Sequence, residues 1–258
     1  GVAVVGAVAA ADAGARAAGG AEGAAPDPGA ALPVRWWQPT REDDGRSGAE
    51  RERAALASKG GEVEALFAAA GVSWPPRQVI FRVFKAERVL EVWASGRARG
   101  PVTPVAAYRI CAASGGPGPK AREGDGQVPE GFYEVDFLKP RSEYYLALHL
   151  NYPNGRDRAV GATGSSIMIH GRCASIGCLA MSDARIQELW VIARALEAGR
   201  RIGVHIYPQR DVAGLAAAAE DPGLREFWGD LAAIKARFDA DRVAPRVGWD
   251  RAGRYQAE

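Results

Sequence analysis

The sequence predicts an α+β fold built on a mostly antiparallel or mixed β-sheet, with helices attached at both ends of the chain. Apolar residues alternate with a period of two through much of the middle of the sequence, which is typical of strands. Segments near the two ends repeat apolar residues at helical spacing. The 258 residues are 47% hydrophobic and 25% charged, which excludes a wholly disordered chain and a collagen-like fibre.

The first 32 residues are expected to lie outside the folded part of the chain. Gly1 to Ala11 form an apolar run that is shorter than the roughly 20 residues a membrane-spanning helix needs, and its small residues resemble the end of an export signal. Ala13 to Leu32 is rich in Ala, Gly and Pro, so it buries too little surface to become ordered. We expect a signal-peptide remnant and a disordered linker over residues 1–32, and no later stretch is apolar enough to be a transmembrane helix.

Residues 33–76 predict an N-terminal helical segment. Apolar residues recur near helical spacing from Glu50 to Ala70, and Gly71 is a suitable end for such a helix. Gly60-Gly61 interrupts the pattern, so one broken helix and two short helices are both compatible with it.

Strands are expected from Gln78 onward, where the apolar period changes to two. The segments on either side of a turn at Ala86-Glu87 predict a β-hairpin. A loop rich in Gly and Pro follows from Ser114 to Gly131. The other strand candidates are Val105 to Cys111, Tyr144 to Tyr152, Ser166 to His170 and Ile202 to Ile206.

Two helices are expected in the second half of the chain. Ser182 is placed to cap a helix that ends at Gly199 and carries an apolar stripe with Trp190. Pro222 to Phe238 predicts a second helix within a C-terminal extension over 211–258.

The charge balance of the chain excludes one class of function. Lys and Arg number 33 against 31 Asp and Glu, a formal net charge of +2. Such a chain lacks the overall basic field that drives nucleic-acid binding.

The densest chemical signal is the segment SIMIHGRCASIGC, from Ser166 to Cys178. A thiol with an ordinary pKa of about 8.5 is mostly protonated at neutral pH, so a nucleophilic cysteine needs a neighbouring base. The loop between His170 and Cys178 is long enough to fold back and bring the imidazole to the sulfur. The amides of Gly177 and Cys178 would then be available as donors to an oxyanion.

Other roles for the cysteines remain open at this point. His170, Cys173, Cys178 and Cys111 could together bind zinc, although the H-x2-C-x4-C spacing lacks a paired C-x2-C knuckle. A Cys173–Cys178 or Cys111–Cys173 disulfide is conceivable in an exported protein. Cys111 is most simply a buried strand residue, and a buried structural role is the ordinary one for a free cysteine.

The segment HGRCASIGCLAM resembles the catalytic signature of the L,D-transpeptidase (YkuD-like) family of bacterial peptidoglycan enzymes. Ser175-Ile-Gly-Cys178 is similar to the S-x-G-C stretch that contains the nucleophile of the family. Three further segments resemble the family in the same order, the last two in particular its YafK-like murein branch: GPGPKAREGD with VPEGFY, NYPNGRDRAVGATGSSIMIHG, and VHIYPQR. The resemblance covers residues 77–210 and implies a YkuD-like β-sandwich catalytic domain.

The resemblance implies roles for individual residues of the loop. Cys178 matches the nucleophile, His170 matches its base, and Gly171 matches the position whose backbone carbonyl orients the imidazole. The backbone at Ile176, Gly177 and Cys178 matches the oxyanion and orienting region. Many members have a second histidine where this chain has Ile176, so a His170 dyad is what remains.

Five residues are candidates for substrate binding, by resemblance or by their place beside the loop. Lys120 is placed to meet a carboxylate of a peptide stem, and Arg172 to bind the free carboxylate of diaminopimelate, although either could be a solvated charge. The other candidates are Asp125, Tyr152 and Ser175, and Tyr152 could do no more than shape a turn.

The resemblance implies an exported enzyme that acts on peptidoglycan peptide stems in the periplasm, with neither a metal nor an organic cofactor. We expect a thioester on Cys178 that passes to an amine, and the partner could be a second stem or a murein-attached lipoprotein. A hydrolase that cleaves stem or lipoprotein–murein amide bonds is the alternative. A non-catalytic peptidoglycan-binding protein is a third possibility.

Overall fold

A computed structural model of the chain describes residues 32–38, 45–196 and 200–257. The signal-peptide remnant and nearly all of the expected linker fall outside these residues. Nine strands form one mixed sheet in the order β1-β4-β3-β2-β9-β5-β6-β7-β8. Their bounds are Val34–Arg35 (β1), Gln78–Phe84 (β2), Val89–Ser95 (β3), Thr103–Arg109 (β4), Gly131–Ser142 (β5), Tyr145–Leu150 (β6), Met168–His170 (β7), Leu179–Ala180 (β8) and Gly203–Tyr207 (β9).

The α+β prediction is confirmed, and the sheet is mixed. The predicted hairpin is the antiparallel pair β2–β3. The pairs β1–β4, β2–β9 and β7–β8 are parallel. Strand β5 joins the two halves of the sheet, because its first residues pair with β9 and its later residues with β6.

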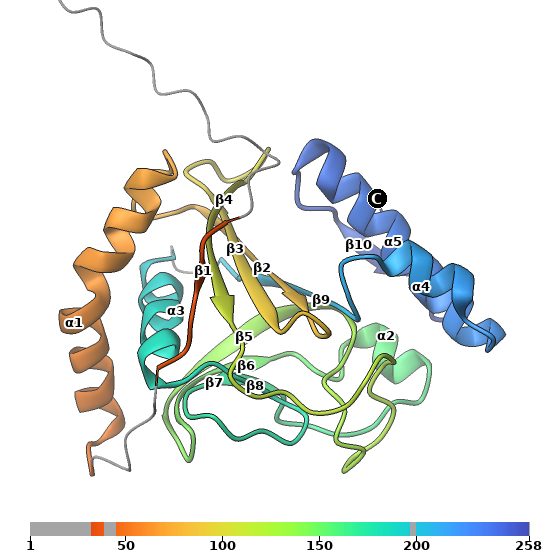
Figure 1. Cartoon of the computed structure of the whole chain (residues 1–258), viewed down its shortest axis with the longest axis horizontal. Coiled ribbons are helices and arrows are strands. Elements are labelled where there is room, and N and C mark those ends of the chain that lie inside the picture. The colour runs from red at the N-terminus through yellow and green to blue at the C-terminus, as the bar shows by residue number, and fades with distance from the viewer. Residues whose placement is uncertain (1–31, 39–44, 197–199, 258) are drawn as a thin grey trace, which may run out of the picture.

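The helices cover two different parts of the sheet (Figure 1). Helix α1 (Gly48–Ala69) and helix α3 (Asp183–Ala195) lie side by side, and their apolar residues join the main core with those of both halves of the sheet. Helices α4 (Val212–Ala218) and α5 (Pro222–Asp241) form a second core against Phe84 and Tyr207. A short helix α2 (Gly155–Ala159) and a hairpin of β10 (Val247–Trp249) and β11 (Tyr255–Ala257) complete the described elements.

Arg82 fastens α5 to the sheet. Its guanidinium donates to Asp239 Oδ1 at 2.7 Å and lies 4.5 Å from the centre of the Phe238 ring. Since a buried guanidinium is tolerated only when its charge is paired, this contact adds to the apolar packing of α5 on the sheet.

Several local predictions need correction. Gly60-Gly61 does not break α1, which is one continuous helix. Ser182 occupies the cap position of α3, but its side chain makes no capping bond; its hydroxyl instead accepts from Gln38 N at 3.4 Å. The expected end of this helix at Gly199 falls outside the described residues. Within the described part of the chain, no helix is long and apolar enough to cross a membrane.

Candidate active site

The predicted catalytic loop connects two neighbouring parallel strands, β7 and β8. His170 is the last residue of β7, and Cys178 directly precedes β8. Ile169 pairs with Leu179 and His170 pairs with Ala180. Because side chains alternate along a strand, Ile169 and Leu179 enter the core while His170 and Cys178 belong to the opposite face. The short loop therefore brings the imidazole and the thiol to one face of the sheet.

The imidazole of His170 is held in one orientation. Its Nδ1 lies 2.6 Å from Gly171 O, so the neutral ring donates from Nδ1 and keeps the lone pair of Nε2 for a proton. The Tyr144 ring covers the imidazole at a centroid distance of 4.5 Å. A Cβ on Gly171 would fall 2.7 Å from Asp183 Oδ1 and 2.8 Å from Tyr144 O, so only glycine fits at this position.

Burial acts on both groups of the candidate pair in the direction that keeps them neutral. It lowers the pKa of His170 below its ordinary value, although the bond to Gly171 acts the other way. Burial also raises the pKa of the Cys178 thiol. A backbone hydrogen bond and the charge of Lys120 act in the opposite direction and lower that pKa. Both groups are therefore neutral at rest, a thiol and a free imidazole, which favours proton transfer during attack over a preformed ion pair.

The two amides expected to bind an oxyanion already have partners. Gly177 N donates to Ser114 Oγ at 2.6 Å, and Cys178 N donates to Ser175 Oγ at 2.9 Å. Gly177 has a φ of 89°, a conformation that glycine adopts without strain. Ile176, just before it, is 85% exposed, so its side chain is open to solvent.

A disulfide joins Cys111 to Cys173, with 5.3 Å between their Cα atoms. This corrects the prediction that Cys111 is a buried strand residue, because it lies just beyond β4 and is half-buried. It also removes the zinc hypothesis, and the described residues contain no cluster suited to a metal. Cys178 is the one free cysteine, so the loop has a single thiol available for chemistry.

Comparison with known proteins agrees with this geometry. The L,D-transpeptidase catalytic domain family, YkuD, matches residues 78–210, which include both strands and the loop. The chain belongs to the L,D-transpeptidase family. It is 38% identical over 173 residues to Escherichia coli YafK, described as a candidate L,D-transpeptidase, and the match covers 66% of this chain and 70% of YafK.

Solved structures give weaker likenesses. The helical cell shape determining protein Pgp2 of Campylobacter jejuni has a TM-score of 0.44 at 18% identity, over 69% of this chain and 75% of that one. Bdellovibrio bacteriovorus Bd1075 has a TM-score of 0.38 at 18% identity, over 64% of this chain and 73% of that one.

Lys120 and Asp125 brace the glycine-rich loop of this L,D-transpeptidase family member. Lys120 is buried and its Nζ donates to Asp125 Oδ1 at 2.6 Å and to Arg122 O at 2.9 Å. Burial opposes ionisation of Asp125, but backbone N–H donors and Lys120 outweigh it and hold the pKa of its carboxyl well below the usual range. Lys120 is thus neither a solvated charge nor free to meet a stem carboxylate while this pair persists.

Three further candidates also serve the local structure. Tyr152 is buried and its hydroxyl donates to Thr163 O at 3.0 Å. Ser175 donates to Cys178 O at 2.6 Å, so its hydroxyl is used within the loop. Arg172 is half-buried with a φ of 56°, and its backbone N donates to Asp183 Oδ1 at 2.7 Å.

The remaining histidines have partners outside the loop or lie buried in the sheet. His149 Nδ1 is 2.7 Å from Asp136 Oδ1, and its ring stacks on Phe137 at 4.1 Å. His205 is buried between β2 and β5.

Sequence reasoning missed Tyr144 and Ser114 at the site. Tyr144 stands in the turn between β5 and β6, and Ser114 lies 63 residues before Gly177. Neither has a local pattern that distinguishes it from an ordinary polar loop residue.

Proposed function

We propose that this protein is an exported cysteine acyltransferase that acts on the peptide stems of bacterial peptidoglycan. The observation that supports it most directly is that a free, half-buried Cys178 lies on the same face of the sheet as an imidazole whose Nε2 is left as the base. Disulfides are typical of proteins outside the cytoplasm, so the Cys111–Cys173 bond supports a periplasmic location.

In the proposed first step, His170 Nε2 takes the thiol proton as Cys178 Sγ attacks the carbonyl of a diaminopimelate residue in the stem. The amide bond to the terminal D-residue breaks, and the imidazolium returns the proton to the departing amine. A thioester on Cys178 remains. An acceptor amine then attacks this thioester, gives its proton to the imidazole, and leaves with the acyl group as a new amide, while the proton returns to the thiolate.

Stabilisation of the oxyanion requires a change at the loop. The amides of Gly177 and Cys178 are proposed donors, but each now donates to a serine hydroxyl. The substrate oxygen must therefore share or displace the hydroxyl of Ser114 to gain the Gly177 N–H. Losing one such donor in an enzyme of this kind costs about 3 kcal/mol of transition-state stabilisation.

Two measurements test the proposal. Intact mass after exposure to a carbapenem, which resembles an acyl donor, is expected to show one adduct on the wild type and none on Cys178→Ala. The Cys111→Ala/Cys173→Ala double variant is the matched control, because it keeps Cys178 and should keep the adduct. An adduct that survives Cys178→Ala would overturn the assignment, and no adduct on the wild type would favour a non-catalytic binding protein.

The products then separate the two enzyme classes. Incubation with defined tetrapeptide muropeptides is expected to give cross-linked dimers or exchanged D-amino acid. Released stems alone, or lipoprotein freed from murein, would show a hydrolase that uses the same residues.

A further inference from the structure

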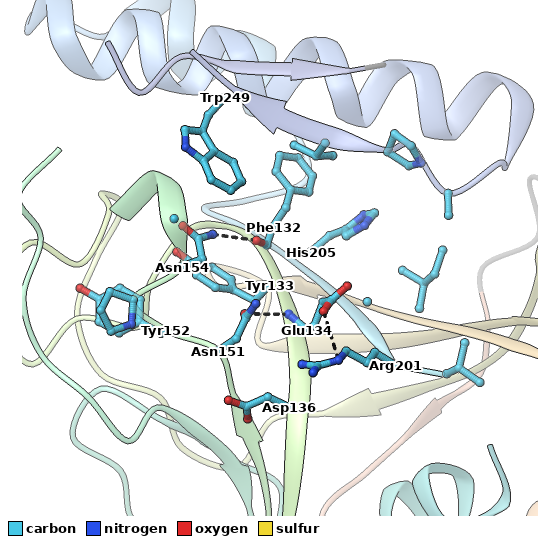
Figure 2. A pocket seen from close by; sticks show the side chains of 18 of the residues that line it. Phe132, Tyr133, Glu134, Asp136, Asn151, Tyr152, Asn154, Arg201, His205 and Trp249 are labelled. Carbon is cyan, nitrogen blue, oxygen red and sulfur yellow. Dashed lines mark hydrogen bonds and ion pairs between the residues drawn. The ribbon is translucent and has the colours of Figure 1, made fainter. Parts of the chain in front are cut away.

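A pocket of about 830 Å³ lies apart from the catalytic loop. Its floor is the region where β2, β9 and β5 are neighbours in the sheet, and its walls are the turn at Asn151–Gly155 and the C-terminal residues 244–249 (Figure 2). No residue from 166 to 180 lines it. Because 300–1,000 Å³ is the usual size of a ligand pocket, this one has room for roughly two sugar rings or a short peptide.

The floor of the pocket contains polar groups without partners. His205 is 5% exposed, and its Nδ1 has no hydrogen bond within the described structure. The Oε1 of Gln78 is also buried and lacks a partner there, and both residues line the pocket. Burying a polar atom without a partner is unfavourable, so a ligand hydroxyl or amide N–H that reached Gln78 Oε1 would be favoured there.

The charges around the pocket balance. Two acids, Glu134 and Asp136, and two arginines, Arg158 and Arg201, line it. Arg201 Nε lies 3.7 Å from Glu134 Oε2 (Figure 2). Asn151 Oδ1 accepts from Glu134 N at 2.9 Å, which leaves its amide NH₂ for another partner. A rim of planar groups with no excess of either sign suits a neutral polar ligand better than a phosphate or a polycation.

One wall of the pocket is an aromatic side chain held in a fixed place. Trp249 is 44% exposed and its ring edge lies against Gly155, where a Cβ would fall 2.1 Å from Trp249 Cζ2. Phe132 also lines the pocket (Figure 2) and packs edge-to-face on His205, with 5.0 Å between the ring centroids. An indole face at the mouth of a polar pocket is a platform for the apolar C–H face of a sugar ring.

The sheet register connects this pocket to the catalytic face. Glu134 lies on the outward face of β5. The stacked rings of Phe137 and His149 lie on the same face. On the neighbouring strands, Ala147 pairs with His170, and by the alternation of β6 it shares the face of His149. A polymer seated in the pocket can therefore extend along the same face toward the candidate base.

We propose that this pocket binds the glycan strand of peptidoglycan, a chain of N-acetylated amino sugars, while the peptide stem reaches the catalytic loop. The proposal rests on the proposed function, because a stem-processing enzyme meets its stems attached to such a strand. The sugar ring stacks on Trp249, and its hydroxyl and acetamido groups bond to Asn151 and the charged rim.

Calorimetric titration of the full chain with chitotetraose, a soluble chain of N-acetylglucosamine, tests this assignment. We expect measurable binding that weakens at least tenfold in Trp249→Ala. Gly155→Ala keeps the indole but crowds it, so it is expected to weaken binding similarly. Trp36→Ala is the matched control, because Trp36 is 62% exposed and does not line the pocket, and it should bind as the wild type does.

The outcomes distinguish this site from the catalytic one. Carbapenem acylation of Cys178 is expected to be unchanged in Trp249→Ala, and Cys178→Ala is expected to keep chitotetraose binding. Failure of acylation with sugar binding intact would overturn the proposed function alone. The glycan site is overturned if millimolar chitotetraose does not bind, if Trp249→Ala and Gly155→Ala both bind like the wild type, or if a sugar-free tetrapeptide displaces the saccharide.

Discussion

Removal of the Cys111–Cys173 disulfide is predicted to lower thermal stability while leaving the candidate nucleophile, Cys178, in place. The bond joins residues with a sequence separation of 62. The chain-entropy relation assigns about 4 kcal/mol to the closure of a loop of that length. For a chain of this size, each kcal/mol corresponds to roughly 2–4 °C in melting temperature, so the Cys111→Ser/Cys173→Ser variant should melt about 10 °C lower.

The assay is thermal unfolding with and without a phosphine reductant. Reductant is expected to lower the melting temperature of the wild type to that of the double variant, and to leave the double variant itself unchanged. Cys178→Ser serves as the control, since it keeps the disulfide and should respond to reductant as the wild type does. A reduced wild type that melts within about 2 °C of the oxidised protein would refute the reasoning, because the loop-closure entropy would then be negligible.

The catalytic loop should survive this change at temperatures well below melting. The segment after β4 is also held by backbone bonds, with Cys111 N and Ala112 N donating to Ala180 O and Ala180 N donating to Ala112 O. Acylation of Cys178 in the double variant is therefore expected to continue. Its complete loss in a folded variant would show that the disulfide positions the thiol.

Three other predictions concern the candidate site. Burial lowers the pKa of His170 below 6.5. On acidification the acylation rate should therefore fall only below pH 6.5, where the imidazole becomes protonated. A fall in rate that begins above pH 6.5 would contradict this prediction. Ser114→Ala removes the hydroxyl that occupies the Gly177 amide, so acylation should accelerate by up to about fivefold, the value of one net hydrogen bond of about 1 kcal/mol. Slower acylation in stopped-flow traces would instead show that Ser114 supports the loop. Lys120→Met leaves the Asp125 carboxylate without its cation, so the free energy of unfolding measured in urea should fall by about 1–3 kcal/mol. Acylation should also slow, because the Cys178 thiol loses a favourable positive charge. An unchanged unfolding free energy and an unchanged acylation rate would show that the pair is dispensable.

Much of the fold was predictable because its signals are local. The hairpin of β2 and β3 and the helix α5 follow from apolar periods of two and of 3.6 that a few neighbouring residues define. The candidate pair could also be named from the sequence, since His170 and Cys178 are only eight positions apart. The loop between them connects two parallel neighbours, β7 and β8.

Strand β5 was not predicted, although it is the longest strand described. Its inward residues Tyr133 and Val135 alternate with acids, a usable signal, but Pro140 and the nearby charges weaken it. The strand is stable because it pairs with β9 on one stretch and β6 on another, and neither partner is visible in its own sequence.

By itself, the sequence determined the fold class, the helices and strands with clear periodicity, and the identity of the candidate thiol and imidazole. Only the tertiary structure decided which cysteine pairs with Cys173, that Lys120 is committed to Asp125, and that the Gly177 amide already has a partner in Ser114. Periodicity reports which face of an element is buried. The partner of a loop residue depends on how distant segments pack, and Ser114 meets Gly177 only because the chain between them folds through β5, β6 and β7.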